Sequence, residues 1–269
     1  MFEHSLAGDI ALPSIAQQLK AFGIKPSKTL GQNFLLDENL CHKIVAASKV
    51  SLHGQDVLEI GAGPGGLTRA ILAQKPRQLV VIEKDRTCLP LLHQLQEVYP
   101  NLVVLEADAL RMDLGVFGGR FHILSNMPYN IASPLLFAIL ELAQRLESAT
   151  VMMQKEMADR ILAGPGCKDY GRLTVNAQAR CHARKCFDIR PSAFFPPPKV
   201  TSTVLHLHPH IGLCFCSKRL DDILRAAFSN RRKMISKSIP IHLLEQLGIA
   251  QQKRPEEVSV EQYIALASL

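Results

Sequence analysis

The chain has 269 residues, of which 47% are hydrophobic and 20% are charged, a composition typical of globular proteins. It excludes a disordered or collagen-like chain, and no apolar run approaches the ~20 residues needed to cross a bilayer. The net charge of +7 is uneven, because residues 1–150 hold 13 basic and 14 acidic side chains and residues 151–269 hold 18 and 10. The basic second half suggests a polyanionic partner, with nucleic acid as the default candidate.

The first residues and the cysteines bear on the cellular compartment. Residues 1–20 include Glu3 and Asp9 and resemble neither a secretory signal nor an Arg-rich transit peptide. The seven scattered cysteines favour reduced thiols. Cys214 and Cys216 stand too close together for the usual ligand pair, so we assign them to a strand or the core and expect no metal site. A cytoplasmic protein without membrane attachment is expected.

Strand and helix patterns alternate through most of the chain. Ser14 and Asp37 are predicted to cap two short helices, the first over residues 14–23. A later helix is predicted at Ser133 with Pro134 in the first helical position, and another begins over residues 67–72. Strands are predicted at residues 56–60, 79–83, 102–105, around 123–124, 150–153 and 203–207. Such alternation is typical of βαβ units and a mostly parallel sheet.

The pattern changes after His210. Helices are predicted at residues 220–228, 241–247 and 259–267, the last with a capping box from Ser259 to Gln262. We therefore expect an α/β domain over residues 1–209 and a small all-α domain over residues 210–269.

A glycine-rich turn follows the first predicted strand of the sheet. Gly61, Gly63 and Gly66 match the pattern GxGxxG, in which glycines let the backbone pass close to a ligand and a helix N-terminus follows. The match alone leaves three readings open: a structural turn, a site for NAD or FAD, or a site for another adenosine ligand.

Acidic residues follow the next two strands. Glu83 ends the second strand, where a carboxylate can accept from both ribose hydroxyls of an adenosine. Asp108 follows the third strand and could accept from an adenine amino group, while the Ala109 N–H could donate to a ring nitrogen. Glu59 precedes the glycines and either meets a cationic group or holds the turn.

The segment SNMPYN follows the fourth strand and carries groups suited to an exocyclic amine. Such an amine is a weak nucleophile, because its lone pair is delocalised into the ring, and it needs acceptors for its N–H groups. Asn126 supplies a side-chain carbonyl and Pro128 a backbone carbonyl without an N–H. Tyr129 supplies a ring on which an extruded base can stack.

With these motifs in place, the chain resembles the S-adenosylmethionine-dependent rRNA adenine N6,N6-dimethyltransferases, and among them the bacterial small-subunit enzymes. One departure is Met127, where Leu is usual, a volume-conserving change. The resemblance covers most of the chain and rests on LGQNFL (30–35), EIGAGPGGLT (59–68), VIEKD (81–85), the Asp108-Ala109 pair, NMPYNIASPLL (126–136), MMQKEMADRI (152–161), YGRLTV (170–175), PSAFFPPPKV (191–200) and FSNRRKM (228–234).

The resemblance implies a Rossmann-like class I methyltransferase sheet and S-adenosylmethionine as cofactor. The residues expected to bind that cofactor are Asn33, Leu35, Gly61, Gly63, Glu83, Asp108, Ala109 and Asn126. It also implies that Asn126 and the Pro128 carbonyl bind the target N6, while Tyr129 and Phe194 stack on the two faces of the base. Methyl transfer would be direct and in line.

The implied substrate is a pair of adjacent adenines in the loop near the 3′ end of small-subunit (16S) rRNA. Unpaired bases cost least to extrude. The implied setting is assembly of the small subunit on a pre-30S particle, and a monomer is expected.

A basic run near the C-terminus is the candidate rRNA contact, with a merely solvated surface as the alternative. Residues 218–237 contain seven Lys or Arg residues. Those expected to grip phosphates are Lys218, Arg225, Arg231, Arg232 and Lys233, and the footprint could extend to Lys25, Lys28, Arg184, Lys185 and Lys199.

Three other functions remain open at this point. A resistance-type methyltransferase would modify large-subunit rRNA with the same chemistry. A non-catalytic assembly or transcription factor would bind RNA only. An NAD-dependent oxidoreductase would use the glycine turn differently.

Overall fold

The computed structural model describes residues 13–212 and 215–269. A seven-stranded sheet with the order β4-β3-β2-β5-β6-β9-β7 lies at its centre. The strands β2 to β6 run parallel, and β9 is antiparallel to both β6 and β7. The bounds are β2 Asp56–Ile60, β3 Gln78–Glu83, β4 Leu102–Glu106, β5 Phe121–Asn126, β6 Leu146–Gln154, β7 Cys181–Ile189 and β9 Ser202–Pro209. The predicted α/β sheet is confirmed.

Helices cover both faces of the sheet, and the strand sequences explain why. Consecutive residues of β2 and β3 are buried on opposite faces, as expected for parallel strands between two helix layers. One face packs against α2, α3 and α4, and the other against α5. The helix bounds in this part are α1 Ile15–Ala21, α2 Glu38–Ala46, α3 Gly66–Leu72, α4 Leu89–Val98, α5 Ala132–Glu141, α6 Lys155–Leu162 and α7 Arg172–Arg180.

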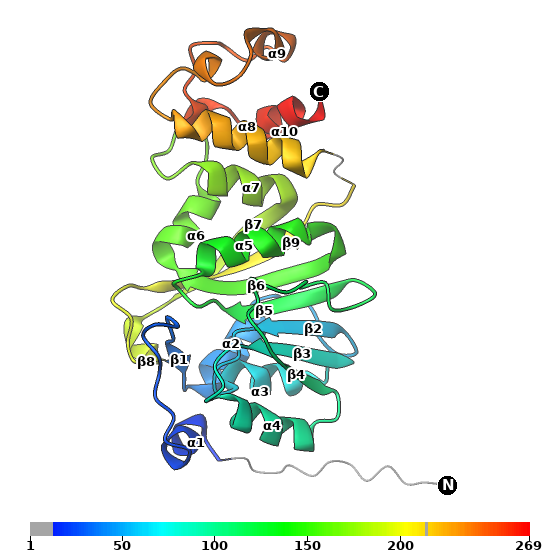
Figure 1. Ribbon diagram of the computed structural model, residues 1–269, viewed down its shortest axis with the longest axis vertical. Helices are drawn as coiled ribbons and strands as arrows, with labels where there is room; N and C mark the ends of the chain where they lie inside the picture. The colour runs from blue at the N-terminus through cyan, green and yellow to red at the C-terminus, as the bar shows by residue number, and fades with distance from the viewer. Residues whose placement is uncertain (1–12, 213–214) are drawn as a thin grey trace.

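The C-terminal helices α8 (Ser217–Ser229), α9 (Ile241–Gln246) and α10 (Val260–Ser268) lie at one end of the molecule, next to α7 (Figure 1). The predicted capping box at Ser259 is present in α10. These helices share a core with Tyr170 and with Val175 of α7. Residues before the expected boundary thus contribute to this core, and the division at residue 209 stays a prediction.

Some local predictions need correction. The helix α5 begins at Ala132, so Pro134 is its third residue, where the missing N–H costs no intrahelical bond. Cys216 is exposed at the start of α8, in neither a strand nor the core, while Cys214 lies outside the described residues. The elements α4, α6, α7 and β7 were not predicted. None of the described helices is long and apolar enough to cross a membrane.

A second, two-stranded sheet joins distant parts of the chain. Its strands are β1 (Phe34–Leu35) and β8 (Phe194–Phe195), which run antiparallel. Leu35 pairs with Phe194, so the segment before the large sheet is tied to the loop that precedes β9.

Candidate functional site

The glycine turn is shaped by close backbone approaches. Gly61 and Gly63 have φ of +75° and +54°, values that L-residues rarely adopt. A Cβ on Gly61 would lie 3.3 Å from Cγ of Pro128, and one on Gly66 would lie 2.8 Å from the carbonyl oxygen of Leu35. The turn is therefore in contact with both the NMPY segment and the residues of β1.

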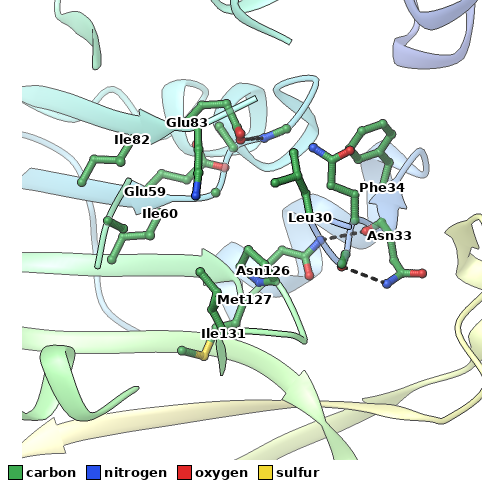
Figure 2. Close-up of a pocket in the computed structure, with 18 of the residues that line it drawn as sticks. Leu30, Asn33, Phe34, Glu59, Ile60, Ile82, Glu83, Asn126, Met127 and Ile131 are labelled. Carbon is green, nitrogen blue, oxygen red and sulfur yellow. Dashed lines mark hydrogen bonds between the residues drawn. The ribbon is translucent and has the colours of Figure 1, made fainter. Parts of the chain in front are cut away.

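A cleft runs along the carboxyl ends of β2, β3 and β5, where open α/β sheets bind ligands. Leu30 and Phe34 approach it from one side, opposite Ile60, Ile82 and Asn126 (Figure 2). Its lining includes all the residues expected at the cofactor: Asn33, Leu35, Gly61, Gly63, Glu83, Asp108, Ala109 and Asn126. The structure therefore brings together residues from five separate segments.

Glu83 is buried at the end of β3, and its carboxylate organises the turn around it. One oxygen accepts from the Gly63 N–H at 2.7 Å and the other from the Asp85 N–H at 2.7 Å (Figure 2 shows the first). Burial raises the pKa of Glu83, and these two hydrogen bonds oppose that shift. Each oxygen retains a further lone pair for a hydroxyl donor.

Glu59 is the fully buried carboxyl in β2. It accepts from the Thr68 hydroxyl of α3 at 2.6 Å. Burial, with the nearby Glu83 carboxylate, raises the pKa of Glu59 to about 8. Of its two possible roles, holding the turn onto α3 is the one this bond supports.

Asp108 and Ala109 lie just beyond β4 at the edge of the cleft. Lys84 donates to Asp108 at 2.9 Å and the Leu110 N–H at 3.1 Å, and the lysine in particular lowers the pKa of Asp108. Within the described residues the Ala109 N–H has no hydrogen-bond partner. This part of the cleft thus offers one anionic acceptor beside one free backbone donor, a pair that fits the Watson–Crick edge of adenine.

Asn126 ends β5, and its side chain reaches the segment before the large sheet, at Asn33. Its Nδ2 donates to the Asn33 carbonyl at 3.2 Å, which leaves Oδ1 as an acceptor (Figure 2). The Pro128 carbonyl accepts from the Ile131 N–H at 3.1 Å and keeps a second lone pair. Two acceptors thus lie beside the glycine turn.

The two aromatic residues expected to sandwich a base are placed differently. Tyr129 lines the cleft, and its hydroxyl pairs with that of Ser202. Phe194 is only 5% exposed and packs in the core with Leu35, and it is not among the cleft-lining residues. The stacking role of Phe194 stays a prediction: it is as buried as its pairing partner Leu35, which does line the cleft.

The family model for ribosomal RNA adenine dimethylases matches residues 23–269. The chain belongs to this family. Among curated relatives, the ribosomal RNA small subunit methyltransferases A of Azorhizobium caulinodans and Xanthobacter autotrophicus are 42% and 43% identical. Each alignment covers 96% of this chain and 92% or 93% of the relative. The protein is therefore a methyltransferase, and the expected cofactor, S-adenosylmethionine, is confirmed for this dimethylase family.

Solved structures agree with this family and fold. A dimethyladenosine transferase from Plasmodium falciparum is 30% identical with a TM-score of 0.72, covering 86% of this chain and 94% of that one. The 23S rRNA methyltransferase ErmE is 26% identical with a TM-score of 0.68, covering 87% and 98%. The predicted class I methyltransferase fold is thereby confirmed.

The basic residues near the C-terminus of this dimethylase divide into two groups. Arg231 donates to the Lys168 carbonyl at 2.6 Å and lies 3.6 Å from Glu256, so it holds two loops together. Arg225 lies 3.7 Å from Asp222 on α8. Lys218, Arg232 and Lys233 are exposed, with no ion pair among the described residues.

Two cleft residues were missed in the sequence. Gln32, in the LGQNFL segment, donates to the Asp85 side chain, and Asn130, in the NMPYN segment, donates to the Thr29 carbonyl. Their positions next to Asn33 and Tyr129 are the only signal that pointed to them.

Proposed function

We propose that this chain transfers methyl groups from S-adenosylmethionine to N6 of two adjacent adenines in the 3′-terminal loop of small-subunit rRNA, giving N6,N6-dimethyladenosine. The observation that carries the proposal is the contact between the glycine turn and the NMPY segment. Because Gly61 lies close to Pro128, the turn expected to bind the cofactor is directly beside the two acceptors for an amine, Asn126 Oδ1 and the Pro128 carbonyl.

The residues present fit the cofactor. Glu83 has spare acceptor capacity for ribose hydroxyls, and Asp108 with the Ala109 N–H matches an adenine edge. Asn33 and Leu35 lie at the other end of the cleft and would meet the methionine part. When bound, the cofactor supplies an electrophilic methyl group on a sulfonium.

The chain's own residues then prepare the nucleophile. In the first transfer Asn126 Oδ1 and the Pro128 carbonyl accept the two amine hydrogens, and in the second one of them accepts the single hydrogen that remains. These bonds draw the nitrogen lone pair out of conjugation with the ring. Tyr129 supports the face of the base, and stacking of this kind contributes ~1–3 kcal/mol. The amine needs no strong base beforehand, because its proton becomes acidic only as the N–C bond forms and the S–C bond of the sulfonium breaks, and that proton is then lost to solvent. Positioning and electrostatics therefore supply the catalysis.

The choice of ribosomal subunit rests on the relatives. Relatives 42% and 43% identical are named for the small subunit, which favours 16S rRNA, whereas the more distant ErmE is named for 23S rRNA. The experiment is mass spectrometry of both rRNAs after incubation of under-methylated subunits with the protein and methyl donor. We expect a gain of two methyl groups on each of two adjacent small-subunit adenines. Methylation confined to large-subunit rRNA would reject the proposal.

The proposed setting is the bacterial cytoplasm, with a monomer acting on a pre-30S particle. The exposed cations Arg232 and Lys233 would contact phosphates, so rRNA affinity should fall steeply with salt. Arg232→Gln should lower the slope of log affinity against log salt by about one. Arg231→Gln is the comparison variant, because loss of the Lys168 and Glu256 contacts should lower thermal stability instead. A salt-independent affinity would remove this role.

A further inference from the structure

Residues 27–35, here called the strap, include the cleft-lining residues 30–35 and are held at two points, by Asp85 just beyond β3 and by Asn130 beyond β5. On the cofactor side, Gln32 Nε2 donates to Asp85 Oδ2 at 2.7 Å, while Gln32 Oε1 accepts from the Ser27 N–H at 2.7 Å. One amide therefore closes the strap on itself and anchors it just beyond β3.

The substrate side of the strap is held by Asn130, four residues after Asn126. Its Nδ2 donates to the Thr29 carbonyl at 3.0 Å. Gly31 has φ of +64°, and a Cβ there would lie 2.8 Å from Asn130 Oδ1. The strap thus lies directly on Asn130, at a place where only glycine fits without a shift.

The residue that follows Gln32 makes the bond to the catalytic amide. The Asn33 carbonyl accepts from Asn126 Nδ2 at 3.2 Å (Figure 2). A flipped amide would set Oδ1 against this carbonyl oxygen, so the strap decides that Oδ1 is the end free to accept from a target amine. The same segment also contributes Leu35 to the cleft.

We infer that the strap couples cofactor binding to the orientation of Asn126, with Gln32 and Asn130 as its positioning residues. The inference rests on the proposed function for the identity of the amine, but the strap geometry does not depend on which RNA is used. Residues 34 and 35 stay paired in β1 when an anchor is lost, but Thr29 lies inside the loop that Gln32 closes onto Ser27. Loss of either anchor should therefore loosen residues 27–33 together, so the two residues act as one unit.

The test is a double-mutant cycle on the full-length protein, with Gln32→Ala and Asn130→Asp. The aspartate has the shape of asparagine and lacks the donor to Thr29. The probe is S-adenosylhomocysteine, whose dissociation constant is measured by calorimetry without turnover. Each single variant should weaken binding roughly tenfold, as expected for about one lost hydrogen bond and a loosened segment.

The double variant separates a shared strap from two independent contacts. A shared strap predicts that the double variant binds about as weakly as either single variant. Independent contacts predict roughly hundredfold weaker binding, and that result, or unchanged binding in the single variants, would overturn the inference.

The matched control is Asn101→Asp. Asn101 Nδ2 donates to the Pro76 carbonyl at 2.8 Å, the same kind of bond, made by a residue that does not line the cleft. This variant should keep the affinity for S-adenosylhomocysteine.

Turnover tests the orientation of Asn126 separately. At saturating cofactor, Asn130→Asp should lower kcat roughly tenfold, whereas Asn101→Asp should not. An unchanged kcat for Asn130→Asp would refute the link to Asn126. Failure to methylate small-subunit rRNA would count against the proposed function and leave the binding cycle intact.

Discussion

Two groups of buried or half-buried polar side chains lie on the same sheet and differ in which hydrogen-bonding groups they leave unpaired. At the carboxyl ends of β2, β3 and β5, Glu83 and Asn126 use part of their hydrogen-bonding capacity and keep acceptors for a ligand. Across β5, β6 and β9, His122 pairs with Ser148 at 2.9 Å and His206 with Thr150 at 3.1 Å. The first group borders a cleft, and the second pairs within the sheet.

The difference teaches that burial of polar groups does not by itself mark a site. Each group contains a side chain whose pKa is shifted chiefly by burial: the pKa of Glu83 is raised and that of His206 falls to about 4. Only the first group combines such shifts with unused acceptors and an open cleft. The structural group therefore predicts stability effects, and the cleft group predicts effects on binding and rate.

The largest effect is expected from Asn126→Ala. Loss of the acceptor for the target amine should lower the transfer rate by roughly 10²–10³-fold, as for other transition-state hydrogen bonds. Cofactor affinity should change far less, since most of the cofactor contacts lie elsewhere in the cleft. Single-turnover transfer and calorimetric binding would separate the two. Lost cofactor binding with an intact rate constant would refute the assignment.

Glu83→Ala should act mainly on cofactor affinity. It removes the expected ribose acceptor and also the two bonds that hold Gly63 and Asp85, so the dissociation constant should rise roughly 10- to 100-fold. The control is Glu106→Gln. Glu106 ends the neighbouring strand β4 and forms an exposed ion pair with Arg86, so this variant should leave the cofactor affinity unchanged. Equal affinities for Glu83→Ala and the wild type would reject the ribose role.

The raised pKa of Glu59 predicts that the protein becomes less stable as pH rises. Its pKa in the folded protein, about 8, exceeds the ordinary value of 4.5. The protonated carboxyl thus contributes stability below pH 4.5, and this contribution is lost as pH rises towards 8. Glu59→Gln cannot ionise, so it should not lose stability in this way. As pH rises over this range, the free energy of unfolding of the variant should increase relative to that of the wild type by about 2 kcal/mol. Local relaxation around the charged carboxylate limits the difference. Denaturant unfolding at pH 5 and 8 measures it, and a constant difference would contradict the assignment.

His206 predicts the opposite direction and a smaller effect. Burial, with the Arg184 charge facing it across the strands and His208 and His122 nearby, lowers the pKa of His206 from 6.5 to about 4. The unfolded chain takes up a proton first, so stability falls as pH drops from 6.5 towards 4. His206→Gln should remove about 1 kcal/mol of that fall. His182→Gln, exposed on β7, is the control, and identical pH profiles for wild type and His206→Gln would reject the prediction.

Much of the candidate site could be predicted from local patterns. Glu83, Asp108 and Asn126 each follow a short apolar strand, and the carboxyl ends of parallel strands meet at one edge of a sheet. A glycine turn between a strand and a helix likewise shows in a few consecutive residues. These features were recognisable because each depends on a segment of fewer than about ten residues, together with one general rule of sheet topology.

Other features depended on contacts between segments far apart in the chain. Phe194 is buried in a core cluster that includes Leu35, and Arg231 is held by Lys168 and Glu256. The strap joins Gln32 to Asp85 and Asn33 to Asn126.

The sequence by itself determined six strands of the large sheet, all but β7, with the glycine turn and the residues at the strand ends, because hydrophobic periodicity and backbone sterics are local. Only the tertiary structure decided which aromatic ring is buried, which cations of the described residues lack an ion pair, and which segment bonds the Asn126 amide. Those outcomes depend on packing and hydrogen bonds between residues as far apart in the chain as Leu35 and Phe194, which no local pattern encodes.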